Sequence, residues 1–533
     1  MIAAGLARSA EASPRARVDA DQVAPGAPST GSVCSGPGIR CYAHVRTDAA
    51  GDIAADAATP NGYGPAELQS AYQIDPAMAK PATIAIVDAY GYANLESDLA
   101  VYRTQFGLPP CTRASGCLKI VNQDGMTSPL PADPPASDDW TVETALDVDM
   151  ASAACPSCKI LVVQGTSNSN GNLYTAQSSA AAAHPTVISD SWGGPTQVGE
   201  DLTGQEPFFD HPGIAQFVSA GDSGYNEGGR GPAYPSTSAH VIAVGGTALA
   251  RSSTTRGWSE VAWTKGGSSC SYSIAKPAYQ TASPCSFRAA SDIAAVGDPA
   301  TGVAVYNASN GGWIVLGGTS ASAPLVAAIF AATGHGDVTA ALISQHIDMF
   351  FDVTSGSNGP CGNLLCNATT GWDGPTGYGT PSARLILAGG GGTGPGPGTL
   401  TVMITSPSEN ASVKGGFKVT ATASAAAVEV GFGIDGTLLQ VAKSAPYEFT
   451  APATLSFGPH LVQVAAADAQ NNVVSSQVHV IVTLGGGGAG AVPIDDGSDA
   501  KSGGCHVSSG TAPISLVAIF VAGLAVCRRR RRA

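Results

Sequence analysis

The chain has 533 residues, of which 44% are hydrophobic and 12% charged, and it contains 67 glycines. This length exceeds what one hydrophobic core usually holds, so we expect two or more folded units, and the apolar content excludes a disordered protein. The net charge of −14 argues against a nucleic-acid partner.

The first 62 residues are rich in Ala, Gly, Pro and Asp and show no periodicity, so we interpret residues 1–62 as a low-complexity segment. Short apolar runs that end in Gly, Asp or Ser then begin at Thr83, Lys159, Thr186, Ile214 and His240. Runs of this kind are typical of a buried parallel sheet with functional groups at the carboxyl ends of its strands. Helical segments at 94–107 and 174–184 lie between them. We therefore predict a doubly wound α/β domain over residues 63–388.

Ten of the twelve cysteines form five pairs that are close in the sequence. Such pairs predict local disulfides and an extracytoplasmic protein, either secreted or held at the cell surface. The Cys155-Pro-Ser-Cys158 pair also fits a redox or zinc motif. No second such motif and no histidine pair accompanies it, so a small disulfide loop is the better interpretation. The five pairs are Cys34 with Cys41, Cys111 with Cys117, Cys155 with Cys158, Cys270 with Cys285, and Cys361 with Cys366.

The remaining quarter of the chain predicts a second folded unit between two linkers. Residues 389–398 are a flexible Gly/Pro linker. Residues 399–484 show strand-like alternation broken by Gly, Pro and Asn, which predicts a small all-β sandwich resembling bacterial immunoglobulin-like modules. We interpret this module as a spacer or adhesion domain, since it holds no cluster of catalytic residues.

A Gly/acidic linker follows at 485–510, and the chain closes on an apolar run and five arginines at 511–533. This pattern predicts a hydrophobic C-terminal segment that anchors the protein at a membrane or cell surface, with the arginines on the cytoplasmic side. It resembles the C-terminal sorting signals of myxobacterial surface proteins. That resemblance implies that Cys505 is the processing or anchoring position.

Ser320 lies in the stretch Gly317-Gly-Thr-Ser-Ala-Ser-Ala-Pro and is a candidate nucleophile. A hydroxyl is a poor nucleophile without a base, and the usual base is histidine. None of the nine histidines has the His-Gly-Thr-x-Val setting of a subtilisin-type enzyme. Glu143 and Asp147 are better placed, four residues apart on a predicted amphipathic helix over 138–155. Two acids on a helix are also common on a solvated surface, which is the alternative interpretation.

Asp222, in Ser-Ala-Gly-Asp-Ser-Gly, is a third acid and ends an apolar strand. These three motifs together resemble the sedolisins, serine-carboxyl peptidases with a subtilisin-like fold, over residues 63–387. The resemblance implies that Ser320 is the nucleophile, that Glu143 is the base and that Asp147 orients and buffers Glu143. It also implies that Asp222 forms part of the oxyanion site. These roles predict a serine-type peptidase, either an endopeptidase or a tripeptidyl-peptidase, that hydrolyses peptide bonds through an acyl-enzyme with an acidic pH optimum.

Two further acids end strands of the predicted sheet. Asp88 lacks a histidine to orient, so we expect a structural or substrate-subsite role. Asp190 is a weaker oxyanion candidate than Asp222, because its segment matches a neighbouring strand and substrate-binding loop of the family.

Residues 350–383 resemble the calcium loop of the sedolisins. The resemblance implies one structural Ca²⁺, held by the carboxylates of Asp352 and Asp373 and by the carbonyls of Val353, Thr369 and Gly371. The alternative is a Gly/Asn-rich turn held only by the Cys361–Cys366 disulfide.

The expected partners are protein or peptide substrates, and we expect a monomer. A catalytically inactive adhesion or binding protein built on a peptidase fold is the competing interpretation. A lipase or esterase is excluded, because Ser320 lacks a Gly-x-Ser-x-Gly elbow.

Overall fold

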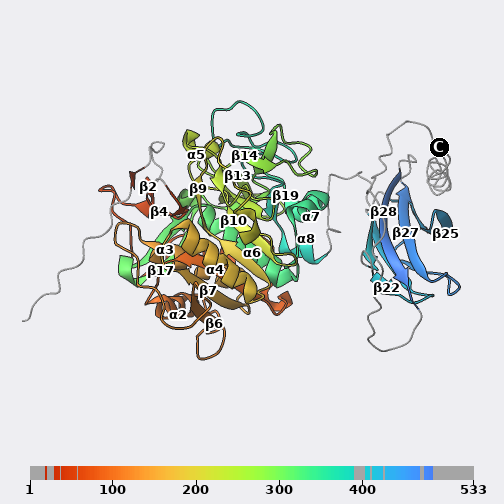
Figure 1. Ribbon diagram of the computed structural model, residues 1–533, viewed down its shortest axis with the longest axis horizontal. Coiled ribbons are helices and arrows are strands. Elements are labelled where there is room, and N and C mark those ends of the chain that lie inside the picture. The colour runs from red at the N-terminus through yellow and green to blue at the C-terminus, as the bar shows by residue number, and fades with distance from the viewer. Residues whose placement is uncertain are drawn as a thin grey trace, which may run out of the picture. The chain divides into compact units, whose positions relative to one another are not determined.

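The computed structural model describes residues 19–20, 29–35, 38–56, 58–388, 402–407, 411–423, 427–467 and 473–483. The chain divides into two compact units, Met1–Gly390 and Gly391–Ala533, which are described separately (Figure 1). The predicted linkers 389–398 and 485–510 and the predicted anchor 511–533 lie outside the described residues. Within the described ranges, no helix is both long enough and apolar enough to cross a membrane.

The first unit is built on a largely parallel sheet, as the sequence predicts. The strand order is β13-β12-β10-β8-β5-β7-β6, with β16 beside β12. Most of these strands are buried along nearly their whole length, which explains their continuous apolar runs. Only β13, at the edge, runs antiparallel to its neighbour. The strands are β5 (Thr83–Ala89), β6 (Leu118–Asn122), β7 (Lys159–Gly165), β8 (Val187–Asp190), β10 (Ala215–Ser219), β12 (Ile242–Arg251), β13 (Trp258–Ala262) and β16 (Ile293–Val296).

Helices pack on this sheet (Figure 1), and two of them carry predicted catalytic residues. Helix α3 (Trp140–Ala154) carries Glu143 and Asp147, and helix α6 (Thr319–Thr333) carries Ser320. The two helices contact each other, and α6 also packs against β8, β10, β12 and β16. The other helices are α1 (Pro65–Ala71), α2 (Leu95–Gln105), α4 (Asn170–Ala182), α5 (Asn226–Gly229), α7 (Ala340–Gln345) and α8 (Ala383–Leu387).

The prediction that α3 is amphipathic is wrong. Every residue from Trp140 to Ala154 is buried. Helices α1, α2 and α6 and strands β5 and β17 all contact α3, so it has no solvent-facing side. The apolar residues Val142, Leu146, Met150 and Ala153 are buried, and so are the polar residues on the remaining faces, Glu143 and Asp147 included.

Residues before Tyr63 also belong to the first unit. Strand β4 (His44–Thr47) pairs with β2 (Ser29–Ser32) and with β18 (Gly312–Gly317), which pairs with β17 (Val303–Asn307); β1 (Asp19–Ala20) pairs with β2. Strand β3 (Arg40–Cys41) pairs with β9 (Trp192–Pro195), which pairs with β11 (Ala233–Tyr234). The sequence analysis places the start of the domain at residue 63, because strands of two to four residues are too short to show periodicity.

Two antiparallel two-stranded sheets complete the first unit, β14 (Ser269–Ala275) with β15 (Phe287–Ala290) and β19 (Phe350–Phe351) with β20 (Thr380–Pro381). All five predicted cysteine pairs form disulfides, which confirms that prediction. Each of these bonds closes a short loop, so they secure local turns rather than joining distant elements.

The second unit is a β-sandwich, as predicted. One sheet has the order β21-β23-β26 and the other β22-β28-β27-β24-β25. Side chains such as Val419, Phe432, Phe449 and Val464 form its buried core. The strands are β21 (Val402–Ser406), β22 (Ala411–Val413), β23 (Lys418–Ala423), β24 (Glu429–Ile434), β25 (Thr437–Ala442), β26 (Tyr447–Thr450), β27 (Gly458–Ala467) and β28 (Val473–Val482).

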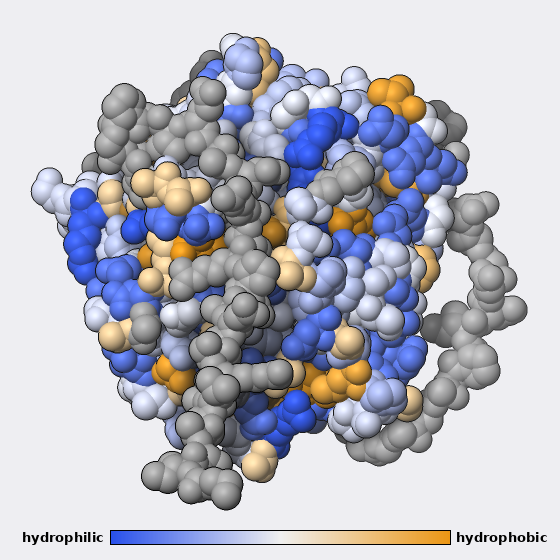
Figure 2. Space-filling model, turned by 90° about the vertical axis from the view of Figure 1, so that its left-hand side faces the viewer, coloured by the Kyte–Doolittle hydropathy of each residue, from blue (hydrophilic) through white to orange (hydrophobic). Residues whose placement is uncertain are grey.

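Figure 2 shows one face of the molecule, on which hydrophilic residues predominate and hydrophobic residues are scattered. Exposed large hydrophobic side chains are spread along the described sequence, for example Met78, Val198 and Phe457. Isolated exposed apolar residues of this kind are usual on proteins and do not mark a docking surface.

Candidate active site

Ser320 lies at the beginning of helix α6, directly after strand β18 and two glycines. Its side chain is fully buried, and its hydroxyl donates a hydrogen bond to the carbonyl of Ser191 at 3.2 Å. Gly318, the residue before the helix, has a φ of +94°. A Cβ at this position would lie 1.8 Å from the Tyr42 carbonyl oxygen, so only glycine fits the turn that presents Ser320.

Glu143 faces Ser320 from helix α3 and is fully buried. Burial raises the pKa of Glu143 well above its ordinary value, and the charges of Asp88 and Asp222 raise it further. The Ser320 hydroxyl and the Ala43 backbone lower this pKa, because they stabilise the charged form. Neither Glu143 oxygen has a contact of full hydrogen-bond geometry among the described residues, so the Ser320 hydroxyl is adjacent but not yet aligned. Such loose geometry is common at catalytic groups without substrate.

Asp147 lies one helical turn after Glu143. Its Oδ1 accepts a hydrogen bond from the Ser191 hydroxyl at 2.8 Å. Burial raises the pKa of Asp147 well above its ordinary value, and the charges of Asp88 and Glu143 add to the effect. Two buried carboxyl groups this close do not both ionise easily, so Glu143 and Asp147 titrate as a pair that retains a proton.

Asp222 follows strand β10 and contacts Thr319, the residue before Ser320. Its Oδ1 accepts hydrogen bonds from the backbone N–H and the hydroxyl of Thr319, both at 2.8 Å. Its Oδ2 is 3.6 Å from His44 Nε2. Burial raises the pKa of Asp222 well above its ordinary value, whereas the two Thr319 contacts lower it. A protonated Asp222 next to Ser320 is able to donate a hydrogen bond to an oxyanion.

Asp88 ends strand β5 and is fully buried with both oxygens lacking a hydrogen-bond partner among the described residues. Burial raises the pKa of Asp88 to about 7, and the Thr144 hydroxyl opposes the rise. Because the Asp88 charge raises the pKa of both Glu143 and Asp147, it is electrostatically part of the same group. We call Asp88, Glu143 and Asp147 the carboxyl cluster.

Asp190 ends strand β8 and is also buried. Burial raises its pKa well above the ordinary value, the charge of Asp88 raises it further, and Gln177 lowers it. Among the two oxyanion candidates of the sequence analysis, Asp222 is the one hydrogen-bonded to Thr319, the neighbour of Ser320.

Sequence reasoning missed several residues of the site. Ser191 bridges the cluster, because its hydroxyl contacts Asp147 and its carbonyl accepts from Ser320. Its position directly after β8 is a signal that was available, since polar residues at strand ends are candidates. His44 and Thr319 have no comparable signal in the sequence.

A cavity of about 490 Å³ opens beside Asp222. Its lining contains Asp222, Ser223, Thr264 and a group of basic side chains, Arg40, His44, Arg230 and Lys265. The cavity is polar and borders the acid proposed for the oxyanion site.

The predicted calcium ligands lie on one loop region. Asp352 Oδ2 accepts a hydrogen bond from the Gly371 N–H at 2.9 Å, and Asp373 Oδ2 accepts one from the Thr369 N–H at 2.8 Å. Burial raises the pKa of Asp373 to about 7, and the Asp352 charge contributes to the rise. The two carboxylates are therefore near each other, alongside Val353.

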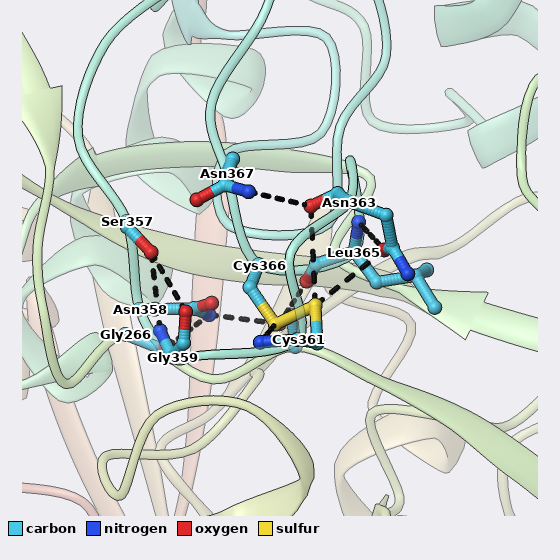
Figure 3. The surroundings of a disulfide bond; sticks show 10 residues. Gly266, Ser357, Asn358, Gly359, Cys361, Asn363, Leu365, Cys366 and Asn367 are labelled. Carbon is cyan, nitrogen blue, oxygen red and sulfur yellow. Dashed lines mark hydrogen bonds between the residues drawn. A yellow bond between two sulfur atoms is a disulfide. The ribbon is translucent and has the colours of Figure 1, made fainter.

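Figure 3 shows the Cys361–Cys366 disulfide within this loop region. The Asn358 side chain donates to the Gly266 carbonyl at 2.7 Å, and Asn367 donates to the Asn363 carbonyl at 3.1 Å. Across the described parts of the chain, no three His, Cys, Asp or Glu side chains gather as a metal centre. Two carboxylates with nearby backbone carbonyls are a hard-oxygen donor set, which fits Ca²⁺ rather than a transition metal.

Residues 141–347 match the subtilase family and residues 401–480 match the bacterial Ig domain family. Kumamolisin from Bacillus sp. (strain MN-32) is 31% identical over 389 residues, which are 66% of this chain and 68% of kumamolisin. Sedolisin from Pseudomonas sp. (strain 101) is 26% identical over 362 residues, which are 61% of this chain and 60% of sedolisin.

A solved structure of Pseudomonas sedolisin, a serine-carboxyl proteinase complexed with two molecules of pseudo-iodotyrostatin, is also similar. It aligns with a TM-score of 0.52 at 25% sequence identity. The alignment covers 62% of this chain and 98% of that chain.

Proposed function

Because the chain belongs to the sedolisin family of serine-carboxyl peptidases and is a serine-type peptidase, we propose that it hydrolyses peptide bonds through an acyl-enzyme on Ser320. The observation that carries this assignment is that the buried Ser320 hydroxyl is adjacent to Glu143 on α3, while Asp222 after β10 binds the neighbouring residue Thr319. No histidine is needed for the proton transfers in this arrangement.

Glu143 acts as the general base in the proposed reaction. It accepts the proton of Ser320 as the hydroxyl oxygen bonds to the substrate carbonyl carbon. It returns this proton to the leaving amine when the peptide C–N bond breaks, and a water molecule then hydrolyses the ester. Ser191 holds Asp147 in place through a hydrogen bond, and Asp147 shares the negative charge with Glu143. General acid–base catalysis of this kind contributes about 10²- to 10⁴-fold to the rate.

Asp222 stabilises the oxyanion of the tetrahedral intermediate while it is protonated. The Thr319 contacts fix its Oδ1, which leaves Oδ2 for the oxyanion. Burial raises the pKa of Asp222, so it keeps its proton in acid and loses it as the pH rises. We therefore expect the activity to be highest in acid.

A single Ca²⁺ held by Asp352, Asp373 and the carbonyls of Val353, Thr369 and Gly371 is the proposed cofactor. A bound Ca²⁺ would supply positive charge that compensates two carboxylates which otherwise repel each other. Two of these residues follow β19 and three precede β20, so a bound ion would hold the two segments together. We therefore expect chelation to lower the melting temperature. An unchanged melting temperature and full activity after chelation would contradict the proposal.

The five disulfides indicate an extracytoplasmic protein. We propose that it is a monomer that acts on protein or peptide substrates outside the cell, with the immunoglobulin-like unit as a spacer or adhesion module. From the sequence, we also propose that residues 511–533 anchor the protein at a membrane or cell surface.

Digestion of casein or haemoglobin at about pH 4, the pH near the ordinary pKa of a carboxyl group, tests the function. We expect the full chain to digest the protein and the Ser320→Ala variant, matched in concentration and fold, to be inactive. If neither protein digests the substrate, the chain is an inactive binding or adhesion protein on a peptidase fold. Equal digestion by both would exclude Ser320 as the nucleophile.

A further inference from the structure

The chain's own residues 40–43 lie against the groups that carry the proposed function. Strand β3 pairs antiparallel with β9, with Arg40 opposite Gly193 and Cys41 opposite Trp192. The Tyr42 N–H then donates to the Ser191 carbonyl at 3.1 Å. The Ser320 hydroxyl donates to the same carbonyl at 3.2 Å, so the Tyr42 backbone and the nucleophile are neighbours.

The peptide bond between Tyr42 and Ala43 lies next to two of the proposed catalytic acids. The Tyr42 carbonyl oxygen lies 1.8 Å from the Cβ position of Gly318, and Asp222 Oδ2 lies 2.6 Å from that same position. On the other side of the bond, the Ala43 backbone stabilises the charged form of Glu143. The carbonyl therefore lies at the proposed oxyanion acid and the amide at the proposed general acid, as a bond to be cleaved would.

The side chain of Arg40 contacts residues of the loop that follows Asp222. Its guanidinium forms an ion pair with Glu227, and both side chains are almost completely buried. It also lies 3.4 Å from the Ser223 hydroxyl. Because side chains alternate along a strand, Arg40 and Tyr42 share a face, and the guanidinium is 5.5 Å from the centre of the Tyr42 ring.

The backbone of the loop that carries Glu227 directs this carboxylate toward Arg40. Glu227 has a φ of +48°, which is uncommon for a residue with a side chain. Its Oε1 occupies the space beside Gly221, where a Cβ would approach it to 1.9 Å. Arg230 is a second cation, 3.5 Å from Glu227 and half-exposed, so the buried carboxylate depends on Arg40 for its close partner.

We propose that residues 40–43 occupy the substrate-binding cleft as a substrate does, and that Glu227 determines specificity by selecting a basic side chain at the third residue before the cleaved bond, counting Tyr42 as the first. This inference rests on the proposed peptidase function and names its substrate class. A neutral side chain at this position would leave Glu227 without its close cation, and an unpaired buried charge is unfavourable.

Synthetic peptides with Arg, Gln or Glu placed before Ser-Tyr-Ala test the selection. The full chain is first incubated at acidic pH, and its mass is recorded to detect cleavage after Tyr42. We expect kcat/KM for the Arg peptide to exceed that for the Gln peptide by at least about tenfold. Glu227→Gln is expected to make these two peptides equal, while the surface variant Glu96→Gln, as the matched control, keeps the preference.

Equal turnover of all three peptides by the full chain would overturn the inference and leave the peptidase function standing, as would a preference that survives Glu227→Gln. A second measurement does not require catalysis. In the Ser320→Ala background, hydrogen exchange of residues 40–43 is expected to rise on Arg40→Ala and less on Arg40→Lys. If neither the chain's own Tyr42–Ala43 bond nor any peptide is cleaved, the proposed function fails. An exchange rate that Arg40→Ala leaves unchanged would overturn the seating of Arg40 on Glu227.

Discussion

The first unit contains two sets of acids with buried side chains. One set is paired with arginines, and the other set has no cation beside it in the part of the chain that the structure describes. Asp292 is paired with Arg288 at 2.7 Å and accepts the Ala243 N–H at 2.8 Å. Glu260 is paired with Arg256 at 2.7 Å and accepts hydroxyl hydrogen bonds from Thr247 and Thr380, both at 2.6 Å.

The carboxyl cluster, by contrast, is packed with acids and has no arginine among the groups that shift its pKa values. Both oxygens of Asp88 and of Glu143 lack a hydrogen-bond partner among the described residues. Burial by itself therefore does not distinguish a structural acid from a catalytic one. Burial raises the pKa values of the carboxyl cluster, and no nearby cation in the described ranges opposes the rise, so these groups can exchange protons.

The largest effect is expected from Glu143→Gln, which keeps the size of the side chain and removes the base. We expect kcat to fall by about 10⁴-fold, equivalent to about 5.5 kcal/mol, with the fold unchanged. Steady-state hydrolysis of a peptide substrate, with circular dichroism as the control for folding, measures this. Retention of most of the activity would contradict the assignment of Glu143 as the base.

Asp292→Asn is expected to affect stability instead of catalysis. It leaves the fully buried Arg288 without its charge partner, and breaking a buried pair costs about 3–5 kcal/mol. Urea unfolding measures the loss, and kcat/KM per folded molecule should stay the same. The exposed pair of Glu96 and Arg113 provides the control, because Glu96→Gln should cost about 1 kcal/mol or less. A large catalytic defect in Asp292→Asn would show that the two sets of acids are not separate.

Asp222→Asn is expected to lower kcat by about 10²- to 10³-fold, or about 2.7–4 kcal/mol, through loss of an oxyanion donor of the right strength. An amide keeps its N–H at every pH, whereas Asp222 loses its proton as the pH rises. The decline of activity toward high pH should therefore weaken or vanish in the variant. A pH profile of kcat/KM tests this, with Asp190→Asn as the control that keeps the wild-type profile. If the activity of the variant declines toward high pH as the wild type does, a group other than Asp222 causes the decline.

The smallest effect is expected from Asp88→Asn. The pKa of Asp88 is about 7 in the folded protein and ordinary in the unfolded chain. Its protonated form therefore stabilises the fold fully below about pH 4, and this stabilisation is lost as the pH rises through about 7. The variant lacks this pH dependence, so its free energy of unfolding relative to the wild type should rise between pH 4 and pH 8. We expect a rise of about 1–2 kcal/mol, because the neighbouring buried acids share the titration. Equal pH dependence of the two unfolding free energies would contradict the pKa assignment.

Local patterns determined much of this protein from the sequence by itself. The parallel strands, the five disulfides and the second, all-β unit each follow from periodicity, spacing or turn residues within a short window. The acids Glu143, Asp147 and Asp222 and the nucleophile Ser320 could be nominated because each lies in a recognisable short motif.

Only the tertiary structure decided how these residues are surrounded. Helix α3 is buried on every side because of what packs on it, which no pattern in its own fifteen residues encodes. The seating of Arg40 on Glu227 joins positions 187 residues apart through a two-residue strand. Charge coupling and desolvation depend on distances between elements that are remote in the chain, so the pKa values that make the site reactive are properties of the packed fold.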